Sequence, residues 1–202
     1  MPHILSQIAN NRYLRRAGNS IDDIYLLDGY EIAGFGEVII PITAQNIKIA
    51  DGLNGDSDEI YVIDYLIHIY NGAAGIYIAP NNIQADQCHQ VAISARNGVV
   101  ASVGDDFKGM FECVVGGEDS FEFGTMIIHA KTGQRRTSKS FGYQTVAFVQ
   151  SIGDPEDGYF VRRDSIWPDT TTNITSLWAW AREGSYMGRG SRWQVYKMRQ
   201  TN

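Results

Sequence analysis

Several features that would point to a particular chemistry are scarce in this sequence. Its 202 residues include two cysteines, which is too few for a disulfide framework. We interpret Cys88 and Cys113 as free buried thiols rather than as a pair. No run approaches the ~18 apolar residues of a membrane-spanning helix, and the first residues lack the continuous apolar segment of a secretory signal. We therefore expect a protein that is made and folded in a cytoplasm and has no membrane partner.

A basic excess is also lacking. The formal net charge is −6, whereas binding to phosphates needs a basic footprint. Free nucleic acid is therefore excluded as a partner of the chain as a whole. The exception is a local cluster of Arg12, Arg15 and Arg16 near the N-terminus.

No recognisable catalytic or cofactor motif occurs. The chain has no nucleophile elbow, P-loop or dinucleotide fingerprint, and its four histidines do not pair at metal-ligand spacing. Carboxylates alternate in residues 51–59 as in a calcium loop, but the required Gly and the final Glu are replaced by Glu59 and Tyr65. We expect a solvated acidic loop there, and neither a metal nor a cofactor.

What the sequence does have is a strong strand pattern. In residues 60–70, every second residue from Tyr61 onward is apolar or aromatic, which is typical of a strand with one buried face. A strand this long and apolar belongs in the middle of a sheet. Asp64 and His68 on its other face would be roughly 13 Å apart, too far for an acid–base pair.

Turn signals separate further strands. Asn97-Gly98 between VAISAR and VVASV is a strong hairpin signal, because both turn residues must accept positive φ. We expect roughly ten strands and no helix outside the N-terminal segment. The pattern predicts an all-β fold, an antiparallel β-sandwich or jelly roll over residues 21–202, preceded by an arm over residues 1–20.

Two segments are candidates for contacts with neighbouring subunits. The arm is either a partly ordered terminus or a segment that docks on another copy. The polar, basic stretch of residues 131–143 is interpreted as a long exposed loop or a protruding ribbon. The predicted contact residues are Ile4, Leu5, Ile8, Arg12, Arg15, Arg16, Arg135 and Arg136.

Aromatic residues concentrate near the C-terminus, where all four tryptophans lie. They either fill the core, as Trp178 and Trp180 would near its end, or form a platform for sugar rings or a partner protein. The residues predicted for such a platform are Trp178, Trp180, Tyr186, Arg189, Arg192 and Trp193.

Two carboxylates allow a third hypothesis. Glu112 and Glu122 flank the Gly116-Gly117 turn and would face one another across a hairpin, as the paired carboxylates of a glycan-active β-sandwich enzyme do. The alternative, which we favour, is that both are solvent-facing carboxylates on a sheet surface.

The segment FEFGTMIIHAKTGQRRTSKSFGYQTVAFVQ resembles hairpins in which a polar loop joins two strands, as in the tail, fibre and capsid-accessory proteins of tailed bacteriophages. The closing SRWQVYKM resembles the last core strand of such modules. The resemblance implies a non-catalytic structural component of a virion, assembled in the host cytoplasm. Its partners would be other virion proteins and copies of itself. The alternative is a carbohydrate- or receptor-binding module that recognises a host surface glycan.

Overall fold

The computed structural model describes residues 30–38, 46–69, 74–83, 86–96, 99–108, 111–116, 120–145, 158–181 and 186–198. The arm predicted over residues 1–20 lies outside these ranges. The described residues form twelve strands and one single-turn helix. In chain order they are β1 (Tyr30–Glu37), β2 (Asn46–Asp51), α2 (Gly55–Asp58), β3 (Ile60–His68), β4 (Ala74–Pro80), β5 (Asp86–Arg96), β6 (Val99–Lys108), β7 (Phe111–Gly116), β8 (Phe121–His129), β9 (Arg136–Thr145), β10 (Gly158–Trp167), β11 (Ser176–Ala181) and β12 (Arg192–Met198).

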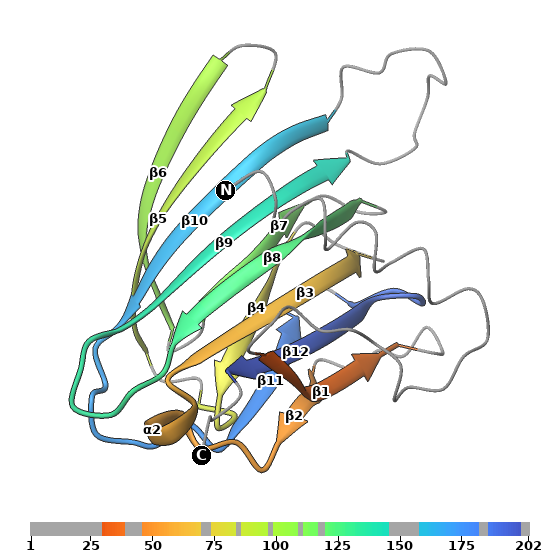
Figure 1. The fold of residues 1–202 in the computed structure, drawn as a ribbon. Coiled ribbons are helices and arrows are strands. Elements are labelled where there is room, and N and C mark those ends of the chain that lie inside the picture. Colours follow the sequence, from red (N-terminus) through yellow and green to blue (C-terminus); the bar gives the residue numbers. More distant parts are fainter. Residues whose placement is uncertain are drawn as a thin grey trace.

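The strands form two antiparallel sheets that pack together (Figure 1). The large sheet has eight strands in the order β1-β12-β3-β8-β9-β10-β5-β6, and the small sheet has four in the order β2-β11-β4-β7. In the small sheet, β2 lies against β1 and β12, and β7 lies against β8, β9 and β10. The predicted all-β sandwich is therefore confirmed.

The strand β3 lies inside the large sheet, between β12 and β8, as its sequence predicts. Tyr61, Ile63, Tyr65 and Ile67 are at most 2% exposed and face the core, whereas the opposite side of the strand is half-buried from Asp64 onward. The alternation of β-branched and aromatic residues therefore marks the centre of the main core. From the small sheet, inward residues of β11 face the same core, namely Leu177, Ala179 and Ala181.

The predicted hairpin is present and longer than expected. β5 and β6 pair from Asp86↔Lys108 to Arg96↔Val99, which leaves Asn97-Gly98 as the connection. Figure 1 shows this hairpin at one end of the large sheet, with β1 at the other end.

The prediction of free thiols has two outcomes. It is confirmed for Cys88 on β5, which is buried and outside any disulfide. The side chain of Cys113 lies outside the described part of the structure, so its state stays a prediction.

The interpretation of residues 131–143 as an exposed loop or ribbon is wrong for most of their length. Only the first of these residues form a turn, and β9 begins at Arg136 and lies in the large sheet between β8 and β10. Ser138 and Ser140 face inward and are at most 1% exposed, whereas Phe141 points outward and is 37% exposed. The segment does alternate with period two, but its buried side carries the polar residues Arg136, Ser138 and Ser140.

The acidic stretch before β3 also differs from the prediction. Gly55–Asp58 forms the single helical turn α2, because the side chain of Asn54 accepts a hydrogen bond from the backbone N–H of Asp56 and caps its start. Asp58 is 4% exposed, so one of the carboxylates expected in solvent is buried.

Candidate contact surfaces

The outward side of the large sheet carries an unusual number of exposed apolar side chains. Alternation along β8, β9, β10 and β5 turns them away from the small sheet, and each is between 37% and 51% exposed. We call this set the outer aromatic face. It consists of Phe121, Phe123, Phe141, Tyr143, Phe160, Val91 and Ile93.

The strand register aligns the aromatic residues in rows. Phe123, Tyr143 and Phe160 lie opposite one another on three adjacent strands, and the ring centroids of Phe123 and Tyr143 are 5.6 Å apart. Phe121 stacks on His68 of β3 with ring centroids 4.3 Å apart. These contacts hold the rings against the sheet but leave one side of each exposed to water.

Three charged residues lie beside the aromatic rows. The guanidinium of Arg162 lies 5.6 Å from the ring centroid of Phe141 and 2.8 Å from a carboxylate oxygen of Asp164. Lys139 is exposed and lies opposite Asp164 in the register of β9 and β10. The outer aromatic face therefore combines apolar rings with charges of both signs.

The inward side of the same strands buries several polar side chains. Arg163 of β10 donates to both carboxylate oxygens of Glu122, at 2.9 and 3.3 Å, and Tyr65 donates to one of them at 3.0 Å. Ser165, also on β10, donates to Gln90 of the neighbouring strand β5 at 3.4 Å. The polarity of this part of the sheet is thus the reverse of the usual arrangement, in which polar side chains face solvent.

This geometry contradicts the paired-carboxylate hypothesis. Glu112 is on β7 in the small sheet and Glu122 is on β8 in the large sheet, so the two do not face each other across a hairpin. Glu122 is fully buried and held by Arg163. The alternative that both carboxylates are solvent-facing is wrong for Glu122 for the same reason.

The residues predicted for an aromatic platform do not lie together. Trp193 is fully buried in the main core, so it is not available to a ligand on the surface. Tyr186 is half-buried, Arg189 is exposed, and Arg192 is exposed on the large sheet beside Glu37. Of the predicted platform, this leaves the two tryptophans of β11 as neighbours.

Trp178 and Trp180 lie on the outward side of the small sheet. They pack against Tyr77 and Ala79, while alternate residues of β11 face the main core, so the interpretation of the pair as core filling is wrong. Both indoles are half-buried. Trp178 donates to Ser176 at 3.2 Å and Trp180 to Asn82 at 2.7 Å, which fixes both rings on the surface.

The predicted subunit-contact residues have different outcomes. Arg136 is fully buried and donates to the carbonyl oxygens of Ala130 and Asp169, both at 3.1 Å, so its prediction as a contact residue is wrong. Arg135 is exposed, and its contact role stays a prediction. The other six predicted residues, from Ile4 to Arg16, lie outside the described residues.

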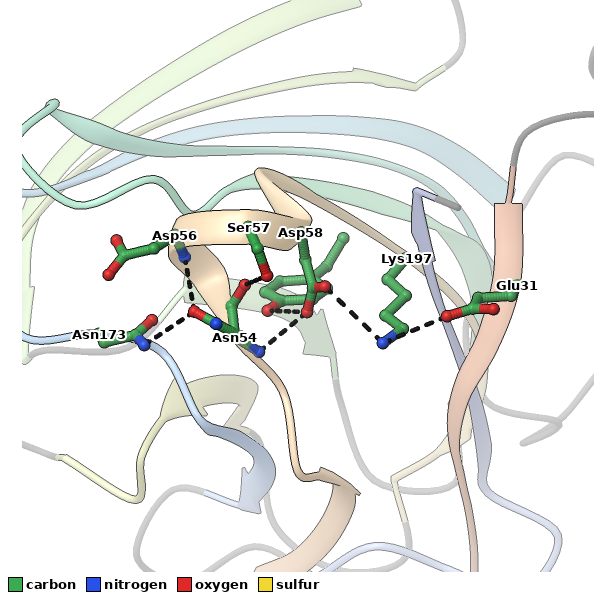
Figure 2. Close-up of polar contacts among 8 residues, drawn as sticks. Glu31, Asn54, Asp56, Ser57, Asp58, Asn173 and Lys197 are labelled. Carbon is green, nitrogen blue, oxygen red and sulfur yellow. Dashed lines mark hydrogen bonds and ion pairs between the residues drawn. The ribbon is translucent and has the colours of Figure 1, made fainter. Parts of the chain in front are cut away.

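A network of side chains around α2 joins several segments at one end of the sandwich (Figure 2). The buried carboxylate of Asp58 accepts hydrogen bonds from the Tyr61 hydroxyl at 2.8 Å and from the Asn54 backbone at 2.9 Å. Lys197 of β12 lies between Asp58 and Glu31, at 3.7 and 3.2 Å. These contacts tie α2 to the sheet, so this end has a structural role.

The network does not resemble a metal site. Within the described part of the chain, no three His, Cys, Asp or Glu side chains are grouped so that they could hold a metal ion. Burial raises the pKa of the Tyr61 hydroxyl, and its hydrogen bond to Asp58 raises the pKa further, so this hydroxyl remains a donor.

Sequence reasoning missed the outer aromatic face, although a signal was present. Phe121 and Phe123, and likewise Phe141 and Tyr143, are spaced two apart in polar surroundings, which is strand alternation with the aromatic side outward. Among the residues that the structure describes, no helix has the length and apolar character needed to span a membrane. Comparison of the chain with protein-family models, with curated proteins and with solved structures gives no match.

Proposed function

We propose that the protein is a non-catalytic structural component that acts through contacts between protein subunits, of the kind that builds a bacteriophage virion. The observation that supports this proposal is the outer aromatic face. Apolar patches of several hundred Å² on a soluble protein mark sites of contact with another protein. Aromatic residues and arginine are also the residue types enriched at such sites.

The size of the patch agrees with this role. Its five aromatic side chains, each with roughly 200 Å² of surface and about 40% exposed, leave roughly 400 Å² in contact with water. The exposed parts of Val91 and Ile93 add to this area. A partner that covered the face would release the water next to it, which is favourable for apolar surface.

The test is the mass of the protein in solution as its concentration is varied. We expect the wild type to assemble, and the double variant Phe123→Thr/Phe160→Thr to shift the mass toward smaller species while it still unfolds in a cooperative transition. Phe35→Thr is the matched control, because Phe35 is 51% exposed on β1, outside the outer aromatic face. The proposal would be contradicted if the wild type stays monomeric, or if the double variant assembles to the same mass as the wild type.

The location in a virion is supported only by the resemblance of residues 121–150 and 191–198. It is tested by whether the chain co-purifies with phage particles through a density gradient. Recovery of the chain only in the soluble fraction would contradict the proposed location in a virion. It would not contradict the proposed subunit contacts, which the mass measurement tests separately.

A second candidate function is recognition of a glycan by Trp178 and Trp180. The supporting observation is that both indole N–H groups are held by Ser176 and Asn82, so the ring faces are fixed on the small sheet. Aromatic faces are suited to stacking against sugar rings. Binding on a glycan array that is lost in Trp178→Ala/Trp180→Ala, with unchanged unfolding, would support this candidate, and no binding by the wild type would eliminate it.

A further inference from the structure

The outer aromatic face has an internal symmetry that comes from the strand register. Across the boundary between β9 and β10, three outward pairs lie directly opposite each other. They are Tyr143 with Phe160, Phe141 with Arg162, and Lys139 with Asp164. In each pair, the two members have chemistry that favours contact: two aromatic rings, a ring with a guanidinium, and two opposite charges.

The flanking strands continue the same arrangement. β8 borders β9 and β5 borders β10. In the row of Lys139 and Asp164, the outer neighbours are Ile127 on β8 and Val91 on β5. In the next row, Thr125 and Ile93 occupy the same places. The two sides of the β9–β10 boundary therefore carry side chains that can form favourable contacts with each other.

We propose that a second copy of this chain covers the outer aromatic face, related to the first by a two-fold axis that runs parallel to the strands between β9 and β10. This inference rests on the proposed function and names its partner and geometry. Such an axis lays β9 of one copy over β10 of the other, in the aligned packing that stacked sheets adopt at about 10 Å separation.

Under this axis, residues that are neighbours within one sheet become partners across the interface. Lys139 of each copy lies over Asp164 of the other, and Phe141 lies over Arg162. Tyr143 then meets Phe160, and Ile127 and Thr125 of β8 meet Val91 and Ile93 of β5. Because a two-fold interface uses the same patch on both subunits, each of these contacts occurs twice.

A two-fold axis perpendicular to the strands fits less well. If it passed through the row of Phe141 and Arg162, it would lay each strand over itself in the reverse direction. Phe160 would then lie over Asp164 of the second copy, and Tyr143 over Lys139. Apolar rings would cover charged groups in both cases. Lys139 would then lose water without gaining an opposite charge from the second copy, and Asp164 would keep only its contact with Arg162 of its own copy.

The exposed aromatic rings supply about half of the area that each partner of a stable pair buries. The exposed parts of the five aromatic rings come to roughly 400 Å², about half of the ~800 Å² that each partner buries in a standard interface. The aliphatic side chains and the long stems of Lys139 and Arg162 surround these rings and supply further area.

The test uses two charge reversals, Lys139→Asp and Asp164→Lys. Each single variant places like charges opposite each other at both copies of the contact, so we expect each to weaken self-association by about tenfold or more. Each also places like charges side by side within its own sheet, so a thermal unfolding scan is recorded to measure the effect on the fold.

Mixing the two variants separates the interface effect from the fold effect. In a mixed pair, the carboxylate introduced at position 139 of one copy faces the ammonium group introduced at position 164 of the other. At the second contact, the unchanged Lys139 and Asp164 face each other. We expect an equimolar mixture to regain association close to that of the wild type. Repulsion within one sheet is not relieved by mixing, so a defect of the fold would persist in the mixture.

Three outcomes would overturn the inference. They are a wild type that stays monomeric, single variants that associate like the wild type, and weakened variants that mixing does not rescue. The first outcome also removes the proposed function. A different result separates the two proposals. If Phe123→Thr/Phe160→Thr disrupts assembly, but the single charge variants associate like the wild type or are not rescued by mixing, the proposed function stands and the two-fold geometry is wrong.

Discussion

Arg163 and Glu122 form an ion pair on the inward side of the large sheet, with Nη1 of Arg163 2.9 Å from Oε1 of Glu122 and side chains that are 2% and 0% exposed. Burial raises the pKa of the Glu122 carboxyl, whereas the charge and hydrogen bonds of Arg163 and the hydroxyl of Tyr65 lower it. The carboxylate is therefore stable in this position only as long as its partners are present.

Replacing Arg163 by Met should destabilise the fold strongly. It leaves a buried carboxylate without its cation, which costs about 3–5 kcal/mol in the free energy of unfolding. Burial then raises the pKa of Glu122 unopposed by Arg163. A carboxyl whose folded pKa is raised contributes stability at low pH and loses it as the pH rises, so the deficit of Arg163→Met should be larger at about pH 7 than at about pH 4.

The control for this prediction is the double variant Arg163→Met/Glu122→Gln, in which both charges are removed and Tyr65 keeps an acceptor. Denaturant titration of the two variants should place the double variant closer to the wild type and make its deficit nearly independent of pH. A double variant as unstable as Arg163→Met would show that the guanidinium acts by packing rather than by neutralising Glu122.

Gly142 on β9 makes room for this ion pair. A Cβ atom at this position would lie 2.3 Å from Oε1 of Glu122 and 2.9 Å from the Tyr65 hydroxyl, and these atoms are held in place by each other. Gly142→Ala should therefore lower the free energy of unfolding by about 1–3 kcal/mol, as overpacking does. Thr137→Ala, on the outward side of the same strand, is the control. Equal unfolding midpoints for the two variants would refute the steric argument.

Asp58 holds α2 to the sheet. Asp58→Asn weakens the hydrogen bonds from Tyr61 and Asn54 and removes the attraction of Lys197, so we expect a loss of about 1–3 kcal/mol. Asp51→Asn is a matched control, because Asp51 is exposed and its ion pair with Lys48 lies on the surface, where solvent screening leaves such pairs with little effect on stability. Thermal unfolding of both variants checks the difference, and similar losses would count against a structural role for Asp58.

Asp169 gives a prediction for acid stability. Burial raises the pKa of its carboxyl, but hydrogen bonds from Thr172 and Thr171 outweigh burial and leave the pKa below its ordinary value. A carboxyl with a lowered folded pKa contributes stability above its unfolded pKa and loses it as the pH falls. Below the ordinary value of 3.8, the wild type should thus lose more stability than Asp169→Asn does. Parallel acid-unfolding curves would contradict this.

The sequence was sufficient to predict the elements whose pattern is local. The buried face of residues 60–70 and the hairpin at Asn97-Gly98 both follow from side-chain alternation and turn chemistry within a few residues. The sandwich as a whole follows from the succession of such strands. The prediction for residues 60–70 succeeded because their hydrophobic residues face the core, as the usual rule assumes. The hairpin prediction rested on turn chemistry, because Val91 and Ile93 of β5 face outward.

The predictions that failed concern residues whose burial depends on distant partners. Arg136 was expected to be exposed, but it is buried, because the ring of Trp167 and the carbonyl oxygen of Asp169 receive its guanidinium. Glu122 is buried because Arg163, 41 positions later, neutralises it. Such pairings are set by the sheet order and leave no local pattern. The outer aromatic face does leave a local signal, the two-residue spacing of its rings, but which side of each strand faces outward depends on the same sheet order.

The place of β12 in the large sheet has a consequence for how the protein is made. β12 follows all other described strands in the sequence, yet it lies between β1 and β3, so β1 has no partner in its sheet until β12 has emerged from the ribosome. The first and last described strands must find each other across the length of the chain, and contacts of such separation slow folding. The large sheet therefore stays open between β1 and β3 until β12 has been synthesised.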